Sequence, residues 1–335
     1  MSPLPATRLP FGRRRSTRFP IAGRLIGSAK GSHQIGVVLH PQKRDSTLAR
    51  ELLDQGAAKA GWPRPLFYET SIAEPGTGQT RRALADGCDL IIACGGDGTV
   101  RVVADALRHT RIPLGIIPIG TANIFARNLV LPTRDLNVAV MIAMHGEAAA
   151  VDIGVARTTT SAQQRDHVFL VLAGIGHDAT TVQGTRPALK ERAGWLAYLE
   201  SASRHAWLRP IEMTLQYPAN PPRTVQAWSV VIGNCGKVPG GIAVFPGAVI
   251  DDGVLDVLEV TVTHPVQWVP IGVKGLLHLR ARTPGLRHAF APQVTIEPSE
   301  PQPVQVDGDV ITGVRRLDVG VDHRAVVVRV PKPRA

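Results

Sequence analysis

The sequence contains few cysteines and few aromatic residues, and it has no long apolar run. Its three cysteines are an odd number, and their apolar or glycine-rich neighbours indicate reduced thiols in a protein core. No stretch approaches the ~20 apolar residues of a membrane-spanning helix, and the residues after Arg18 lack the core of a signal peptide. These absences predict a cytoplasmic protein that is soluble or bound to a membrane surface.

Positive charge is in excess, and it is concentrated in two stretches that contain no acid. The 38 basic and 27 acidic residues give a net charge of +11. The basic residues are Arg8, Arg13, Arg14, Arg15, Arg18, Arg24 and Lys30 in residues 1–32, and Lys274, Arg280, Arg282 and Arg287 in residues 260–296. Such local charge predicts contact with an anionic surface, and the scarcity of aromatic residues in both stretches favours lipid head groups over nucleic acid.

The sequence pattern divides the chain into a tail and two domains. Residues 1–32 are rich in proline and arginine and are aperiodic, which predicts a flexible tail. In residues 33–147, short apolar segments alternate with amphipathic ones, which predicts a parallel, doubly wound α/β domain. The expected strands are 35–39, 66–70, 89–94 and 114–118, and the expected helices are 48–60, 79–85, 100–108, 124–129 and 136–144.

Residues 148–335 favour a β-rich second domain. Apolar segments separated by proline and Asp-Gly turn signals predict an antiparallel sandwich or curled sheet, whose last strand could return to the first domain. The expected strands are 149–156, 168–172, 211–217, 227–232, 254–262, 304–306 and 325–330, and the expected helices are 189–207 and 265–279.

A glycine loop in the first domain is the clearest functional signal. Three glycines, Gly95, Gly96 and Gly98, bracket Asp97 between an apolar strand and a helix pattern. Glycine lets the backbone approach a ligand, and a helix start offers free N–H groups, so the expected guest is a phosphate. The loop lacks the lysine of a Walker A motif, so Asp97 is expected to bond loop amides or to hold Mg²⁺. The alternative is an ordinary strand-to-helix turn with an aspartate cap.

A second glycine loop follows the next strand, at Gly120, Thr121 and Asn123. Thr121 and Asn123 are expected to cap the helix that follows, and Thr121 could also donate its hydroxyl to a phosphate or a sugar. The carboxyl ends of neighbouring parallel strands share one edge of a sheet. We therefore expect both glycine loops to face one crevice.

The second half contains motifs with weaker signals. The segment 174–179 fits the spacing G-x-G-x-x-A, but the helix and acid of a dinucleotide fold do not follow, so His177 is expected to be structural. The acidic segments 249–256 and 304–309 each contain Asp-Gly. They predict hairpin turns first and hard-cation sites second.

Taken in order, these motifs resemble the diacylglycerol kinase catalytic-domain family, bacterial lipid kinases that are similar to sphingosine and ceramide kinases. The resemblance extends from about residue 35 to residue 331. The residues that match are Gly95-Gly96-Asp97-Gly98-Thr99, Gly120-Thr121-Ala122-Asn123, Phe125-Ala126-Arg127, Gly174-Ile175-Gly176, Asp178-Ala179, Gly233-Asn234, Gly240-Gly241, Pro246, Asp251-Asp252-Gly253, Leu255-Asp256 and Asp307-Gly308.

The resemblance implies that the chain uses ATP and Mg²⁺ to phosphorylate a lipid hydroxyl in a cleft between its two domains. It assigns nucleotide contacts to Thr70, Gly95, Gly96, Asp97, Gly98, Thr99, Val100, Arg101, Gly120 and Thr121. It assigns Mg²⁺ to Asp252 with backbone oxygens near Val249 and Val254. Asp309, helped by Asp307, falls where the family usually has a glutamate as general base. The expected partner is a lipid at an anionic membrane surface, with no nucleic acid, and a homodimer is left open.

Three positions depart from the family pattern. Asp309 is one methylene shorter than the usual glutamate, Arg101 stands where asparagine is usual, and His40 ends the first strand where asparagine is common. Two alternatives therefore stay open beside a lipid kinase. One is a catalytically impaired lipid-binding relative, and the other is a soluble small-molecule kinase of the NAD kinase type.

Overall fold

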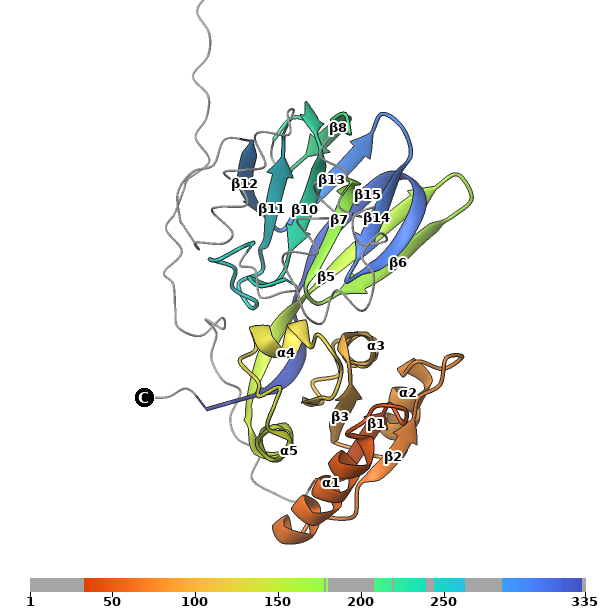
Figure 1. The fold of residues 1–335 in the computed structure, drawn as a ribbon, viewed down its shortest axis with the longest axis vertical. Coiled ribbons are helices and arrows are strands. Elements are labelled where there is room, and N and C mark those ends of the chain that lie inside the picture. Colours follow the sequence, from red (N-terminus) through yellow and green to blue (C-terminus); the bar gives the residue numbers. More distant parts are fainter. Residues whose placement is uncertain are drawn as a thin grey trace, which may run out of the picture.

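The computed structural model describes residues 33–177, 179, 208–218, 220–238, 244–262 and 285–332. They form an α/β domain, drawn at the bottom of Figure 1, and a β domain above it. The predicted tail 1–32 and the predicted helices 189–207 and 265–279 lie outside the described residues.

The α/β domain is built on four parallel strands in the spatial order β2-β1-β3-β4. The strands are β1 (Ile35–Leu39), β2 (Leu66–Glu69), β3 (Leu90–Gly95) and β4 (Leu114–Pro118). The helices are α1 (Ser46–Ala60), α2 (Thr77–Ala85), α3 (Asp97–Ala106), α4 (Ile124–Asn128) and α5 (Leu136–His145). Because α1 packs on α5 and α2 packs on α3, helices cover both faces of the sheet. Continuous burial of β1, β3 and β4 is typical of such a sheet, and the predicted doubly wound fold is confirmed.

The second domain is antiparallel and rich in strands, as predicted. Its strands are β5 (Glu147–Thr160), β6 (Gln164–Phe169), β7 (Leu172–Gly176), β8 (Ile211–Gln216), β9 (Arg223–Ala227), β10 (Ser229–Gly233), β11 (Leu255–Val260), β12 (Leu286–Ala291), β13 (Gln293–Pro298), β14 (Gln302–Val306) and β15 (Asp309–Val330). The prediction missed β9, β12, β13 and the first half of β15. These segments carry many polar residues and only a short apolar alternation, which is a weak local signal for a strand.

The strand expected at 168–172 is wrong, because the chain breaks there into β6 and β7. The backbone N–H groups of Leu170, Val171 and Leu172 all donate to the carboxylate of Asp307. A distant side chain thus takes hydrogen bonds that a continuous strand would give to its neighbour.

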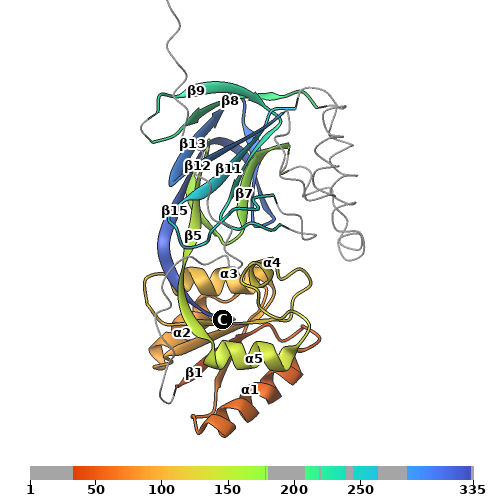
Figure 2. The same cartoon turned by 90° about the vertical axis from the view of Figure 1, so that its left-hand side faces the viewer.

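The pair of β5 and β15 joins the two domains. Its antiparallel register extends from Val314 opposite Thr160 to Val330 opposite Glu147, with irregularities at two places. Near its end, β15 also pairs in parallel with β4, through Val328 and Leu114. Figure 2 shows both strands extending from the β domain into the α/β domain. The last strand therefore returns to the first sheet.

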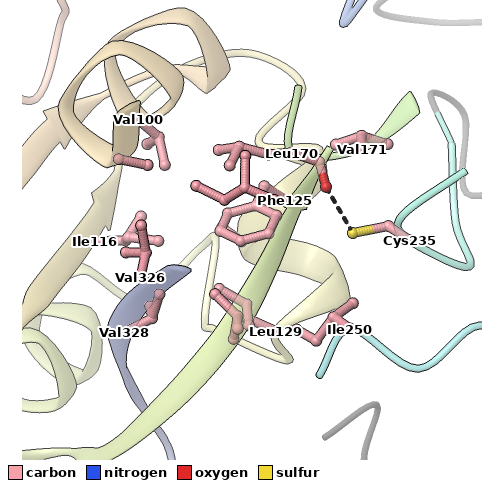
Figure 3. Packing of buried hydrophobic residues seen from close by; sticks show 14 of the residues in the cluster. Val100, Ile116, Phe125, Leu129, Leu170, Val171, Cys235, Ile250, Val326 and Val328 are labelled. Carbon is pink, nitrogen blue, oxygen red and sulfur yellow. Dashed lines mark hydrogen bonds between the residues drawn. The ribbon is translucent and has the colours of Figure 1, made fainter. Parts of the chain in front are cut away.

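A shared hydrophobic core reinforces this connection (Figure 3). Phe125 of α4 and Leu129, which follows this helix, belong to the same buried cluster as Leu170, Ile250 and Val326. Burying a side chain of this size contributes about 1.5–3 kcal/mol. The three cysteines, Cys88, Cys94 and Cys235, are buried and free, as predicted.

Asp152 lies at the point where β5 meets the acidic turn and an irregular part of β15. Its carboxylate is fully buried and accepts bonds from the backbone N–H of Gly253 at 2.7 Å and of Arg324 at 2.7 Å. It also lies 2.8 Å from Nδ1 of His323. One side chain thus fixes the acidic turn to the strands that connect the domains.

We expect Asp152→Ala to lower the free energy of unfolding by about 3–5 kcal/mol, because the N–H groups of Gly253 and Arg324 and the His323 ring lose the buried carboxylate that binds them. The control is Asp166→Ala, which removes an exposed carboxylate paired with Arg157 and should cost about 0–1 kcal/mol. Urea-induced unfolding of both variants tests this, and equal small losses would contradict the role of Asp152.

Candidate functional site

The structure brings the predicted nucleotide-binding residues together at one edge of the parallel sheet. Thr70 directly follows β2, and its backbone N–H donates to the carbonyl of Leu39 at 2.9 Å. The two glycine loops follow β3 and β4, and the backbone N–H of Ile119 donates to the carbonyl of Gly95 at 3.1 Å. Ligands of doubly wound sheets bind beyond this edge.

The two glycine loops touch, as their position after adjacent strands predicted. A Cβ atom added to Gly120 would lie 2.4 Å from the Cα atom of Gly96. A Cβ atom added to Gly95 would lie 2.5 Å from Oγ1 of Thr99. Backbone cannot yield to such an approach as a flexible side chain can, so the loop contact itself requires glycine at position 120.

The N-terminus of α3 points its first amides out of the glycine loop. Gly96 is the N-cap residue and supplies no side-chain cap. The N–H groups of the first helical turn have no acceptor within the helix, and the helix dipole makes this end positive. Gly98 is exposed, and a Cβ atom there would have no neighbour within 4 Å. Gly98, exposed in this first turn, is therefore the residue most accessible to an anion.

Asp97 joins the two loops. Its Oδ1 atom accepts bonds from the backbone N–H of Ile124 at 2.7 Å and of Phe125 at 3.2 Å. Burial raises the pKa of the Asp97 carboxyl, and the bonds from Phe125 and Ile124 oppose that rise. Asp97 was predicted either to bond backbone amides or to hold Mg²⁺. The structure shows bonds to backbone amides, at the start of α4.

The prediction that the Asn123 side chain caps α4 is wrong. Asn123 is the N-cap residue, with a left-handed φ of 48°, but its side chain makes no capping bond. Its amide instead accepts from the N–H of Gly120 at 3.1 Å and donates to the carbonyl of Gly120 at 2.6 Å. Asn123 thus closes the second loop, while Asp97 binds the start of α4 from the first loop. Thr121, at the tip, is exposed.

His40 lies at the same edge, directly after β1. Its Nδ1 atom is buried and has no hydrogen-bond partner. A buried polar atom without a partner is unusual in a folded protein. The sequence shows that His40 replaces the common asparagine at this position. Only the structure shows that its Nδ1 atom has no hydrogen-bond partner.

Asp307 and Gly308 form the turn between β14 and β15, which confirms the predicted hairpin. Both have positive φ, 46° and 95°, and they connect the paired residues Val306 and Asp309. The Asp307 carboxylate accepts three backbone N–H groups of residues 170–172, at 2.7–3.0 Å. Burial raises its pKa, and bonds from these amides oppose the rise. These contacts give Asp307 a structural task in holding the turn.

Asp309 differs from Asp307, because its side chain is 69% exposed. It forms an ion pair with Arg101, a residue one turn into α3 and 208 positions away in the sequence. The fold thereby brings the predicted base into contact with the helix of the glycine loop. Sequence reasoning selected both residues but did not foresee that they touch.

The acidic segment 249–254 is not the tip of a hairpin, so that expectation is wrong. Residues 244–254 contain no strand before β11, because the backbone bonds of Ile250 and Gly253 go to Asp152. Asp252 is exposed, and its Oδ1 accepts from the N–H of Val254 at 3.2 Å. The other expectation for this acidic segment is a site for a hard cation.

The oxygen donors of this turn suit a magnesium ion that also binds waters and the phosphates of a substrate. Within the described ranges, no group of three His, Cys, Asp or Glu side chains could hold a metal. Magnesium commonly takes one or two carboxylates, keeps several waters and shares the phosphates of a substrate. One carboxylate, Asp252, with the carbonyls of Val249 and Val254 fits that requirement.

The first three residues of the G-x-G-x-x-A segment are the end of strand β7. Gly174 pairs with Val231 and with Gln305, and Gly176 pairs with Ser229. Both glycines are thus paired strand residues rather than parts of a pyrophosphate loop. His177 lies 3.1 Å from the carbonyl of Arg209 and packs on Trp228, in agreement with the predicted structural role.

We expect Asp97→Asn to keep the free energy of unfolding within about 1 kcal/mol, because both amide bonds go to Oδ1, which asparagine retains. Asp97→Ala should cost about 2–4 kcal/mol, since two backbone donors lose their acceptor. Urea-induced unfolding measures both. Equal losses in the two variants would show that the charge of Asp97, rather than its bonds to α4, stabilises the loops.

Two family models match consecutive parts of the chain. The family described as "Diacylglycerol kinase catalytic domain" matches residues 38–156. The family described as "YegS C-terminal NAD kinase beta sandwich-like domain" matches residues 171–326. The matches cover the glycine loops and the β domain with Asp309.

Curated relatives agree with these matches. A diacylglycerol kinase of Bacillus subtilis is 28% identical over 246 residues, which are 72% of this chain and 78% of that protein. A YegS-like protein of Chromohalobacter salexigens, named a probable lipid kinase, is 30% identical over 234 residues, 68% of this chain and 72% of that protein. An uncharacterised protein of Synechocystis is 30% identical over 232 residues, which cover 68% of this chain but only about half, 51%, of the relative.

Solved structures share the fold. A diacylglycerol kinase from Bacillus anthracis has a TM-score of 0.67 at 22% identity, covering 91% of this chain and 99% of that chain. Yeast NADH kinase is more distant, with a TM-score of 0.50 at 11% identity, covering 91% of this chain and 85% of that chain. With both family models and relatives of 30% identity in agreement, this chain belongs to the diacylglycerol kinase and YegS-like family.

Proposed function

We propose that this protein is a kinase that transfers the γ-phosphoryl group of ATP to a hydroxyl group of a diacylglycerol-like lipid. The contact between Arg101 of the glycine-loop helix and the exposed carboxylate of Asp309 is the main support. It joins a phosphate-binding element to a candidate base. The names of the relatives, diacylglycerol kinase and probable lipid kinase, support the same acceptor class.

The nucleotide phosphates bind at the carboxyl edge of the parallel sheet. The amides of residues 97–99 and the Gly120–Thr121 loop donate to the phosphate oxygens, and the exposed Thr121 hydroxyl is available to a phosphate or to the ribose. Phosphoryl transfer depends mainly on such positioning and on neutralised charge.

Asp252 and the carbonyls of Val249 and Val254 would hold Mg²⁺, which would supply positive charge to neutralise the phosphates. The same turn is fixed by the buried Asp152. Rigid support of this kind keeps a site in one geometry.

Asp309 is the general base. Its exposed carboxylate accepts the proton of the acceptor hydroxyl, whose oxygen then forms a bond to the γ-phosphorus while the bond to the leaving ADP breaks. Asp307 has its carboxylate bound to three amides, so it acts on the reaction by holding the turn on which Asp309 lies.

The acceptor reaches the site from a membrane surface. No helix within the described residues is long and apolar enough to cross a membrane. The acid-free basic stretches 1–32 and 260–296 are suited to anionic lipid head groups on the cytoplasmic side. A cytoplasmic, peripherally bound enzyme is the arrangement that we propose.

Labelled ATP, Mg²⁺ and detergent-dispersed acceptors test the activity. We expect phosphatidic acid from diacylglycerol, or a phosphorylated product from ceramide, sphingosine or phosphatidylglycerol. NAD serves as the soluble acceptor in the same panel. Phosphorylation of NAD alone would replace the proposal with the NAD kinase reading, and nucleotide binding without any product would favour a catalytically impaired relative.

Asp309→Ala should lower kcat by about 10²–10⁴-fold, the usual contribution of a positioned base. The affinity for ATP should stay within about twofold, because Asp309 is assigned to the acceptor side. Asp166→Ala, which removes another exposed carboxylate, is the matched control and should leave kcat unchanged. An equal loss of nucleotide binding and turnover in Asp309→Ala would remove Asp309 from the role of base.

A further inference from the structure

Arg101 makes two contacts with the β14–β15 hairpin through one guanidinium group. Nη1 donates to the carbonyl of Val306 at 3.0 Å, and Nη2 forms the ion pair with Asp309. Val306 and Asp309 are the paired residues that close the two-residue turn. The planar fork of arginine is suited to two directed bonds, which the single ammonium of lysine cannot reproduce.

Both ends of this contact are firmly held. On the helix side, Val100 and Val103 are buried in the core shared by the domains. On the hairpin side, three backbone amides bind Asp307. The Arg101 side chain is only 20% exposed, whereas the Asp309 side chain is 69% exposed. A well-packed arginine therefore restrains a carboxylate that would otherwise rotate freely in solvent.

Stability does not account for this arrangement. An ion pair with one strongly exposed partner contributes about 0–1 kcal/mol. The effect of the pair on geometry is larger, because it selects one position for the Asp309 carboxylate relative to α3. A displacement of about 1 Å in a reacting group can cost 10²-fold in rate.

A histidine of the neighbouring strand lies close to the pair. His167 of β6 lies close enough to interact electrostatically with both Arg101 and Asp309, and α3 packs against β6. Burial lowers the pKa of His167, and the charges of Arg101 and Arg165 lower it further. His167 also lies 3.1 Å from the Thr158 hydroxyl. A lowered pKa favours the neutral form of His167, so the Arg101 guanidinium is the cation that holds the Asp309 carboxylate.

On the basis of the proposed function, the geometry points to Arg101 as a positioning residue for the base. Arg101 places the Asp309 carboxylate beside the phosphate-binding helix, so that two departures from the family pattern form one matched pair. Asp309 is shorter than the usual glutamate, and Arg101 is longer than the usual asparagine. The longer Arg101 side chain on α3 thus makes up for the shorter Asp309 side chain on the β14–β15 hairpin.

A double-mutant cycle tests the pair. Its variants are Arg101→Asn, Asp309→Glu and the combination of both, assayed for kcat, for the KM of the lipid and for the affinity of ATP. Each single change should lower kcat by about 10–100-fold, and the double variant should recover to within about threefold of the unaltered chain. ATP affinity should change only in the variants that alter position 101, because Arg101 is among the expected nucleotide contacts and Asp309 acts on the acceptor side.

Two further variants keep the test independent of folding. Arg101→Lys retains the charge but not the fork and should lose kcat with an unchanged melting temperature. Arg108→Asn removes another arginine of the same helix region, one that pairs with Asp105 and Asp322, and should leave kcat unchanged.

The outcomes separate the two proposals. Losses of kcat that multiply in the double variant, or full activity of Asp309→Glu or Arg101→Lys alone, would overturn the positioning role while leaving the kinase intact. Failure of the unaltered chain to phosphorylate any lipid would overturn the proposed function, and the positioning role with it.

Discussion

The antiparallel pair of β5 and β15 is the constraint on which the rest of the molecule depends. β15 begins at Asp309 beside the helix of the glycine loop and ends in the sheet of the α/β domain, where Val328 lies beside Leu114. Backbone hydrogen bonds along β5 keep this strand in one register. A shift of the β domain against the α/β domain would therefore break a ladder and open the shared core around Phe125. The candidate base Asp309 and the first glycine loop keep their relative position for this reason.

Carboxylates in this protein divide into two physical classes. Asp97, Asp152 and Asp307 accept two or three directed bonds each, mostly from backbone N–H groups, and join segments that are distant in the sequence. A carboxylate with several amide donors can be buried at an acceptable cost in free energy. Asp309 is exposed and has an arginine as its partner. The first class builds the site, and the second is available to a substrate.

Much of the fold and part of the site could be predicted from local patterns. The alternation of apolar strands and amphipathic helices in residues 33–147, and the glycine loops that follow two of those strands, depend on neighbours in the chain. The break between β6 and β7 could not be predicted, because the acceptor that causes it is Asp307. For the same reason, the local sequence predicts Thr121 and Asn123 as caps of α4, whereas the Asp97 side chain binds its first amides.

The sequence by itself predicted the two-domain division, a phosphate as the guest of Gly95–Thr99 and Asp309 as the candidate base. These follow from residue type, spacing and backbone freedom, which are properties of short segments. Only the tertiary structure decided which carboxylates are structural and which is accessible, and that Arg101 contacts Asp309 across 208 residues. Such contacts are set by strand register and by packing between domains, and neither is encoded in any single segment of the chain.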